Sequence, residues 1–287
     1  SPLLQLPPAI NLSLNQAPLL ANAQDWFTPR RFILIVLGNN PGEAAESRTL
    51  LRAGEVFGIT ANRMRVALSR LVSEGLLDNP RRGHYRISKQ GALVQREIDS
   101  WRELEQRRVA WQGDWCALLT ENLASAGSTL WRHQLRVLNL RGLQRWRPGL
   151  WVRPNNLVGG LEQLVEDLRQ LGLDAIQSSF VVSQGDAACE TELQSLWDCK
   201  AINKQYQKQE RLIARAKAQL PKKNFNKALV ETLFIGSETV RMLNMDPLLP
   251  DQMIDGELRR AVISSMSEFD TIGKDMWREF YDSLSGD

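Results

Sequence analysis

The segment from Gly58 to Leu77 constrains the fold more than any other part of the chain. Its apolar residues recur with i, i+3, i+4, i+7 spacing and predict one buried helix face: Met64, Ala67, Leu68 and Leu71. Thr60 precedes them as an N-cap, because its hydroxyl accepts a hydrogen bond from a free N–H of the first turn, and Gly75 ends the helix. The opposite side carries small, polar or basic residues: Asn62, Arg63, Arg65, Val66, Ser69 and Arg70.

Two further helices are expected before this one. Pro29 opens a helix that runs to Leu37, since proline is well placed in a first turn, and the sequence of residues 39–42 breaks it. Residues 47–57 give a second helix, and Gly58 supplies the tight turn before Thr60.

A β-hairpin is expected after the third helix. Leu76 and Leu77 begin a short strand, Asn79–Gly83 form a turn, and His84–Ser88 alternate like a strand. The complete order predicts a winged helix-turn-helix domain over residues 29–90, with a basic tip on the wing. The alternative is an ordinary amphipathic helix beside a surface hairpin.

The winged-helix interpretation assigns a DNA-binding role to each exposed residue of this segment. Base edges would be contacted from the third helix, which begins at Thr60 and exposes Val66, through Asn62, Arg63, Arg65 and Ser69. Phosphates or the adjacent minor groove would be held by Arg30, Arg31, Arg70, Arg81, Arg82 and His84.

The distribution of charge agrees with this assignment. Residues 29–90 hold 11 lysines and arginines against 5 acidic residues, a net charge of +6. Residues 224–287 hold 6 against 12, a net charge of −6. A basic module attracts phosphates, whereas an acidic one is repelled by them, so we expect the last third to lie away from a duplex.

The rest of the chain predicts an α+β, multidomain protein. A linker helix is expected over residues 91–112. Residues 113–198 alternate strands (115–119, 149–154, 175–182) with helices (128–140, 161–171), an order that resembles a ferredoxin-like sheet. Residues 199–287 are predicted to be a mainly helical C-terminal domain, interrupted by a turn over residues 246–251.

Residues 200–223 are unexpectedly basic, with 8 lysines and arginines and one glutamate. Five of the basic residues follow 4, 4, 3, 4 spacing and share one helix face: Lys200, Lys204, Lys208, Arg211 and Arg215. Three interpretations stay open for this face: a solvated surface, a second phosphate contact, and a docking surface for the acidic last third.

Several classes of function are disfavoured by composition. No run approaches 18 apolar residues, which argues against a membrane span. Residues 1–28 lack lysine and arginine and carry interrupting prolines, so we expect an N-terminal arm rather than a secretory signal. Three cysteines without CxxC spacing fit a reducing cytoplasm. With only two histidines and no nucleophile-elbow motif, we predict no metal, no cofactor and no catalytic residue.

Three blocks of sequence resemble the PaaX family of transcriptional repressors. The first covers Arg65–Leu71, Glu74–Leu77 and Tyr85–Gly91. The second is Gly149–Pro154, with Leu196-Trp197-Asp198 and then Tyr206, and the third is Asp246–Pro250. The similarity extends over about residues 28–287.

The resemblance implies a dimeric repressor of an aromatic-acid catabolic operon. It implies release from DNA by a small effector, an acyl-CoA such as phenylacetyl-CoA, and a middle domain related to the small ferredoxin-like nucleases of CRISPR adaptation. Nuclease activity is not implied, because the expected acidic metal ligand at the end of the first strand is missing unless Glu121 fills that place. A cytoplasmic repressor is therefore the main hypothesis. The alternative is a metal-dependent nuclease or nucleic-acid-processing protein that docks through the winged helix.

Overall fold

The protein is an α+β chain with two small antiparallel sheets. The computed structural model describes residues 28–39, 42–121, 123 and 126–285, so the predicted N-terminal arm lies outside the described residues except for Thr28. The chain forms two compact units. We call residues 28–100, 211–240 and 264–285 the N-terminal unit, and residues 101–210 and 241–263 the middle unit. None of the helices in the described ranges is both long enough and apolar enough to cross a membrane.

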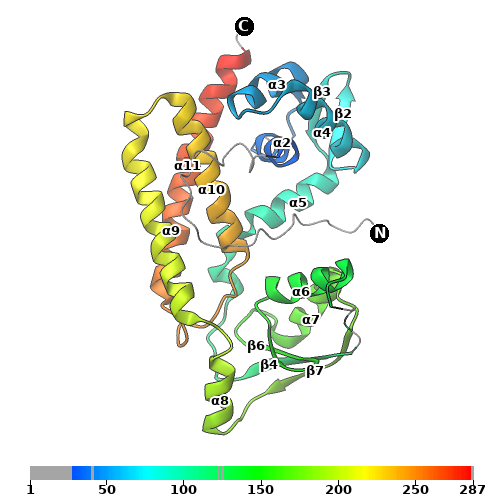
Figure 1. The fold of residues 1–287 in the computed structure, drawn as a ribbon, viewed down its shortest axis with the longest axis vertical. Coiled ribbons are helices and arrows are strands. Elements are labelled where there is room, and N and C mark those ends of the chain that lie inside the picture. Colours follow the sequence, from blue (N-terminus) through cyan, green and yellow to red (C-terminus); the bar gives the residue numbers. More distant parts are fainter. Residues whose placement is uncertain (1–27, 40–41, 122, 124–125, 286–287) are drawn as a thin grey trace. The chain divides into compact units, whose positions relative to one another are not determined.

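The N-terminal unit begins with three helices and a three-stranded sheet (Figure 1). The helices are α2 (Pro29–Gly38), α3 (Ser47–Val56) and α4 (Ala61–Ser73), as the sequence predicts. The strands are β1 (Ala45–Glu46), β2 (Leu77–Arg81) and β3 (His84–Ile87), in the order β1-β3-β2. Helix α5 (Lys89–Asp99) follows and is capped by the Ser88 hydroxyl, which accepts from the Gly91 backbone N–H.

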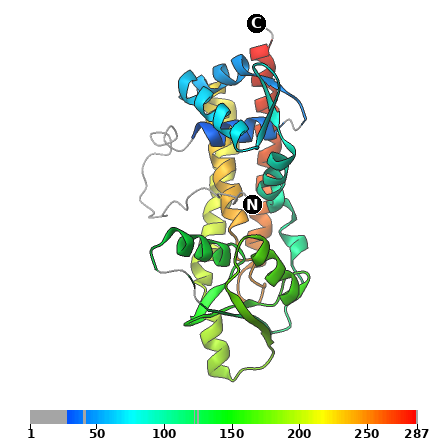
Figure 2. The ribbon, with the colours of Figure 1, turned by 90° about the vertical axis from the view of Figure 1, so that its right-hand side faces the viewer.

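Two later helices complete the core of this unit. They are α10 (Phe225–Asn244) and α11 (Gly256–Ser285), which lie side by side in Figure 2 and contact each other through Thr232 and Gly273. Trp277 of α11 is 2% exposed and packs against Phe32 of α2, with ring centroids 6.1 Å apart. The residues of the helical last third therefore supply part of the core under α2, α3 and α4.

The structure corrects three expectations for this region. The hairpin turn is shorter than residues 79–83, because Pro80 and Arg81 belong to β2 and only Arg82 and Gly83 remain between the strands. Strand β1 was not expected, and it pairs with β3. The linker is not one helix over 91–112: α5 ends at Asp99, two 3-10 turns follow (Ser100–Glu103 and Glu105–Arg107), and residues 109–114 are not helical.

The middle unit is built on a four-stranded antiparallel sheet in the order β5-β6-β4-β7. In chain order its elements are β4 (Trp115–Thr120), α6 (Thr129–Leu140), β5 (Gln144–Arg147), β6 (Leu150–Pro154), α7 (Gly160–Gln170) and β7 (Ile176–Val182). Helices α6 and α7 lie on the same face of the sheet (Figure 1), where Val137, Leu138 and Leu168 pack on Cys116 and Leu118. Strand β5 was missed by the sequence interpretation, whereas the other three strands begin and end within one residue of the prediction.

The chain then continues through helices α8 (Ala187–Gln194) and α9 (Cys199–Gln219) and a 3-10 turn at Leu220–Lys222. Helix α9 has residues in both units, as do α10 and α11. The helical character expected for residues 199–287 is confirmed, and so is the non-helical segment between Asn244 and Gly256. The predicted division into five parts stays a prediction.

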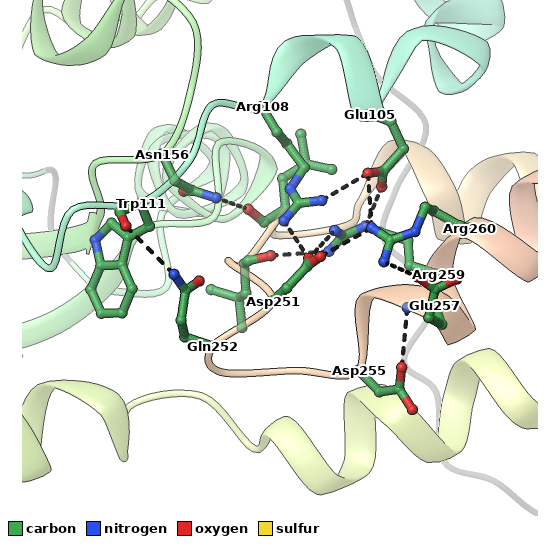
Figure 3. Close-up of polar contacts among 12 residues, drawn as sticks. Glu105, Arg108, Trp111, Asn156, Asp251, Gln252, Asp255, Glu257, Arg259 and Arg260 are labelled. Atoms are coloured by element: carbon green, nitrogen blue, oxygen red, sulfur yellow. Dashed lines mark hydrogen bonds and ion pairs between the residues drawn. The ribbon is translucent and has the colours of Figure 1, made fainter.

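A network of buried and half-buried ion pairs holds this non-helical segment in the middle unit (Figure 3). The fully buried Arg259 donates to Glu105 Oε1 at 2.6 Å, to the Leu249 carbonyl oxygen at 3.0 Å and to Asp251 Oδ1 at 3.2 Å. Arg108 donates to Glu105 and Asp251 at 2.8 and 2.5 Å. Burial alone would raise the pKa of Glu105, but the hydrogen bonds and charges of Arg259 and Arg108 outweigh it, so the pKa of Glu105 is lowered.

A second buried pair lies close to this network. The Tyr206 hydroxyl donates to Asp246 Oδ2 at 2.5 Å, and Asp246 Oδ1 accepts from the Leu248 backbone N–H at 2.8 Å. Burial raises the pKa of Asp246 and of Tyr206, since both charged forms lose hydration. Tyr206 and residues 246–250 therefore pack together. Asn156 belongs to the same cluster, because its amide donates to the Leu248 carbonyl oxygen at 2.8 Å.

Candidate nucleic-acid interface

Helix α4 has one buried side and one exposed side. Its start is fixed by Thr60, whose hydroxyl accepts from the Arg63 backbone N–H at 3.4 Å, after Gly58 turns the chain with a φ of 71°. The buried side consists of the residues predicted from their spacing: Met64, Ala67, Leu68 and Leu71. This core contact leaves the other side of the helix available to a ligand.

The exposed side carries the residues that the sequence assigned to base edges. The residues Asn62, Arg63, Arg65, Val66 and Ser69 are exposed to solvent, and so is Arg70, which was assigned to phosphates. Val66 is 44% exposed, so the exposed side also offers an apolar contact. The guanidinium groups of Arg63, Arg65 and Arg70 make no hydrogen bond or ion pair within the described ranges of the chain. Three unneutralised cations therefore surround a short apolar and hydroxyl-bearing strip.

The β2–β3 hairpin presents a second basic surface. Arg81 Nη2 donates to His84 Nε2 at 2.7 Å, and His84 Nδ1 lies 3.2 Å from the Arg82 carbonyl oxygen. Because arginine only donates, His84 Nε2 is the acceptor, and the proton on Nδ1 donates to the carbonyl. The tip of the hairpin is therefore ordered internally. The Arg82 guanidinium remains exposed there without a partner in the described part of the chain.

Arg30 and Arg31 differ from the other predicted phosphate ligands. Arg30 forms an ion pair with Glu74, the residue that caps the C-terminal end of α4, and the two side chains are 42% and 44% exposed. Arg31 is half-buried. A phosphate at Arg30 would have to compete with Glu74, so any role of Arg30 depends on this ion pair.

Sequence reasoning missed Arg48, an exposed cation in the first turn of α3. The neighbouring Ser47 backbone N–H donates to the Gly83 carbonyl oxygen at 2.7 Å, which ties the start of α3 to the tip of the hairpin. Arg48 and Arg82 are therefore brought to one region by a contact between residues 36 positions apart. No local pattern in the sequence contains this information, because it arises from the pairing of β1 with β3.

Three observations concern candidate metal ligands and nucleophiles in the described residues. These residues contain no group of three or more His, Cys, Asp or Glu side chains arranged to hold a metal ion. Glu121 directly follows β4, which ends at Thr120, one residue later than predicted, and its side chain is exposed. Cys116 is buried, and burial raises the pKa of its thiol to about 11, which disfavours the nucleophilic thiolate.

Comparison with known proteins supports the family assignment over the first part of the chain. Residues 29–91 match the sequence model of the family described as PaaX-like protein, so the predicted resemblance is confirmed for the segment that contains α2–α4 and the hairpin. Over these residues the chain carries a PaaX-like sequence. No curated protein is similar enough to match the chain.

A solved structure gives a likeness at the level of the fold. The uncharacterized protein Rv0674 from Mycobacterium tuberculosis has a TM-score of 0.60 to this chain and is 23% identical in sequence. The match covers 90% of this chain and 99% of the other. At this identity the comparison concerns the fold alone, and it extends well beyond the PaaX-like segment.

Proposed function

We propose that the protein is a DNA-binding transcriptional regulator, with residues 29–91 acting as a winged helix-turn-helix. The observation that carries the proposal is the exposed side of α4, which presents unpaired guanidinium groups beside Asn62, Val66 and Ser69. The element order α2-β1-α3-α4-β2-β3 and the PaaX-like sequence of the same residues support it. Such a helix fits the major groove, where arginine and asparagine read base edges.

In this proposal the two surfaces have different tasks. Arg65, Asn62 and Ser69 contact base edges, with Arg63 and Val66 beside them, whereas Arg70, Arg82 and the Arg81–His84 pair hold the backbone. We also propose that Arg30 and Arg31 of the same domain contact the DNA backbone. Since phosphate contacts carry no sequence information, the two groups are separable by experiment.

The test begins by selecting duplexes that bind the full chain from a random-sequence pool. Arg65→Ala should weaken binding to the selected duplex by about 1–3 kcal/mol and relax the preference at one position. Arg82→Ala should weaken selected and random duplexes equally. Arg96→Ala is the matched control, because Arg96 is an exposed cation of the same unit on α5. Equal effects of all three substitutions would refute the assigned roles.

The regulatory part of the proposal is repression relieved by a small effector. We propose a homodimer that acts in the cytoplasm, has no enzymatic activity and needs no cofactor. The effector would be an acyl-CoA such as phenylacetyl-CoA, which would favour one of two states of the dimer and lower operator affinity by its differential affinity. Operator footprinting with a panel of acyl-CoA thioesters tests the effector. Sedimentation of the free protein tests the homodimer.

A hollow in the middle unit is the place to look for the effector. It is a shallow hollow open to solvent, with a volume of about 530 Å³, and its wall includes Trp197, Met245, Gln205 and Asn139. Asp198 is the charged residue of its lining, and no lysine or arginine belongs to it. The hollow therefore suits an uncharged aryl or acyl group, and the phosphates of a CoA would need cations from outside it.

We further propose that the middle unit has the ferredoxin-like topology. Its strand order β5-β6-β4-β7, with α6 and α7 as the two connections on one face, supports this proposal, because a split βαβ unit has the same order of elements. The unit would serve here as a scaffold for regulation.

Arg153 of this unit has a structural role. Its side chain is buried and donates to the Pro154 carbonyl oxygen at 3.1 Å and to Asn156 Oδ1 at 3.0 Å.

A further inference from the structure

Helix α9 exposes a row of basic side chains along its length. With about 3.6 residues per turn, the five members fall within an arc of roughly 80° around the helix axis. All five are exposed: Lys200, Lys204, Lys208, Arg211 and Arg215. We call them the α9 basic row.

The opposite side of α9 is fixed to the protein. The Tyr206 hydroxyl donates a hydrogen bond to Asp246, and Asn203 Oδ1 accepts from the Asp255 backbone N–H at 3.0 Å. Ile213 and Ala216 of the same side are buried. The row is therefore held outward by a helix that cannot roll about its axis without breaking these contacts.

Four of the five members of the row are not paired with the acidic last third. Lys217 pairs with Glu268 at 2.5 Å, and Lys223 pairs with Glu231, but neither lysine belongs to the row. Lys200, Lys204, Lys208 and Arg215 make no hydrogen bond or ion pair with any described residue. The sequence left open a docking of this basic segment on the acidic helices, and the pairs of Lys217 and Lys223 are contacts of that kind outside the row.

The composition of the row indicates the kind of partner. The exposed residues next to the row are alanine and glutamine (Ala201, Gln205, Gln207, Ala214 and Ala218), with no exposed large apolar side chain. A membrane-surface helix needs an apolar face to insert. The hot spots of protein interfaces are Trp, Tyr and Arg packed in desolvated pockets, whereas the arginines of the row have only small or polar exposed neighbours on the helix. Duplex DNA needs neither an apolar face nor such pockets, because release of counterions by lysine and arginine supplies the affinity.

We propose that the α9 basic row binds the phosphate backbone of duplex DNA as a second contact, separate from that of α4. Lys200 and Lys208 are about 12 Å apart along the helix, at 1.5 Å per residue. A duplex carries one charge per about 1.7 Å of its axis, counting both strands, so phosphates are dense enough for each cation of the row to have one within reach. This inference rests on the proposed function, and it predicts binding energy without sequence preference.

The experiment compares two triple variants of the full chain. The first is K200Q/K204Q/K208Q. The control, R132Q/R145Q/R169Q, removes three exposed cations of the middle unit that lie on α6, β5 and α7, so the net charge changes equally. Affinity for a labelled random-sequence duplex of about 40 base pairs is measured by fluorescence anisotropy over a range of salt concentrations. Circular dichroism checks that each variant is folded.

The row variant should lower the steepness of log K against log salt by about 0.9 for each phosphate that is no longer neutralised, which is roughly 2.7 for three. Between 50 and 200 mM salt its affinity should then fall about 40-fold less than that of the wild type. The control should keep the wild-type slope, and the row variant should keep the sequence preference set by Arg65.

Two results would overturn the inference and leave the proposed function standing. One is a row variant whose salt slope equals that of the control, while the wild type still shows an Arg65-dependent preference; the proposed function would then stand without the second contact. The other is loss of binding to phosphatidylserine vesicles in the row variant with an unchanged duplex slope, which would assign the row to a membrane surface. A wild type that binds no duplex at all would remove the proposed function and this inference together.

Discussion

Replacing Arg259 tests how much the buried ion network stabilises the middle unit. Its guanidinium is fully buried and donates to Glu105, Asp251 and the Leu249 carbonyl oxygen. Arg259→Ala leaves this carbonyl without its donor and removes one of the three guanidinium groups that pair with Glu105 and Asp251. Breaking a buried ion pair from one side costs about 3–5 kcal/mol. Glu105 and Asp251 are partly exposed and keep Arg108 and Arg260, so we expect a loss at the lower end of that range in the free energy of unfolding.

The adjacent Arg260 is a matched control. It pairs with the same two carboxylates, Glu105 and Asp251, and also with Glu257, but its side chain is 37% exposed. Solvent screens these pairs, so Arg260→Ala should cost about 0–1 kcal/mol. The two variants remove the same group next to the same partners and differ mainly in burial.

Hydrogen exchange read by mass spectrometry measures this difference locally, which matters because the chain has two units and its unfolding need not be two-state. Peptides from β4, β6 and residues 246–259 should lose protection in Arg259→Ala and keep it in Arg260→Ala. Equal losses in the two variants would show that burial of the guanidinium does not set its contribution, and the reasoning from the network would be wrong.

Three further outcomes are expected. Val66→Asp should abolish duplex binding and leave the melting temperature unchanged, because the side chain is exposed and a carboxylate there repels phosphates; a fall in melting temperature would contradict the exposed position. Trp277→Ala should destabilise the N-terminal unit by about 3–5 kcal/mol in urea titrations, since it leaves a cavity beside Phe32, and a small loss would refute its place in the core. The pKa of Glu105 is lowered in the folded state, so its stabilising contribution is present above the ordinary pKa and is lost as the pH falls through the lowered value. Melting temperatures of Glu105→Gln should therefore fall less steeply than those of the wild type on acidification, and parallel curves would exclude this role.

Local sequence patterns predicted the elements that position the candidate interface. The period of Met64, Ala67, Leu68 and Leu71 defined the buried side of α4, and Thr60 defined its start. Both are decided within a few residues of chain, by helix geometry and by the need to satisfy the first backbone N–H groups. Once the buried side of α4 was defined, its remaining residues were expected to be exposed.

Elements that depend on distant partners could not be predicted in this way. Strand β1 is two residues long and exists because β3 offers it a partner. Strand β5 carries two arginines and a tryptophan in Gln144–Arg147, a composition that does not favour a strand until β6 pairs with it. The linker kept helical spacing as far as Leu104, yet α5 ended at Asp99, because Trp101 and Leu104 are buried in 3-10 and turn conformations.

The largest difference between sequence and structure concerns which cations are available to a ligand. The net charge of +6 over residues 29–90 counts every arginine equally. In the structure Arg30 is paired with Glu74 and Arg86 lies 3.5 Å from Asp78, whereas Arg65 and Arg82 have no partner in the described ranges. A phosphate at a paired arginine replaces one anion by another, so it releases little counterion, while a phosphate at an unpaired arginine contributes the full salt-dependent term. The salt slope of duplex binding should therefore follow the unpaired cations of α4, the hairpin tip and α9 rather than the total charge of the chain.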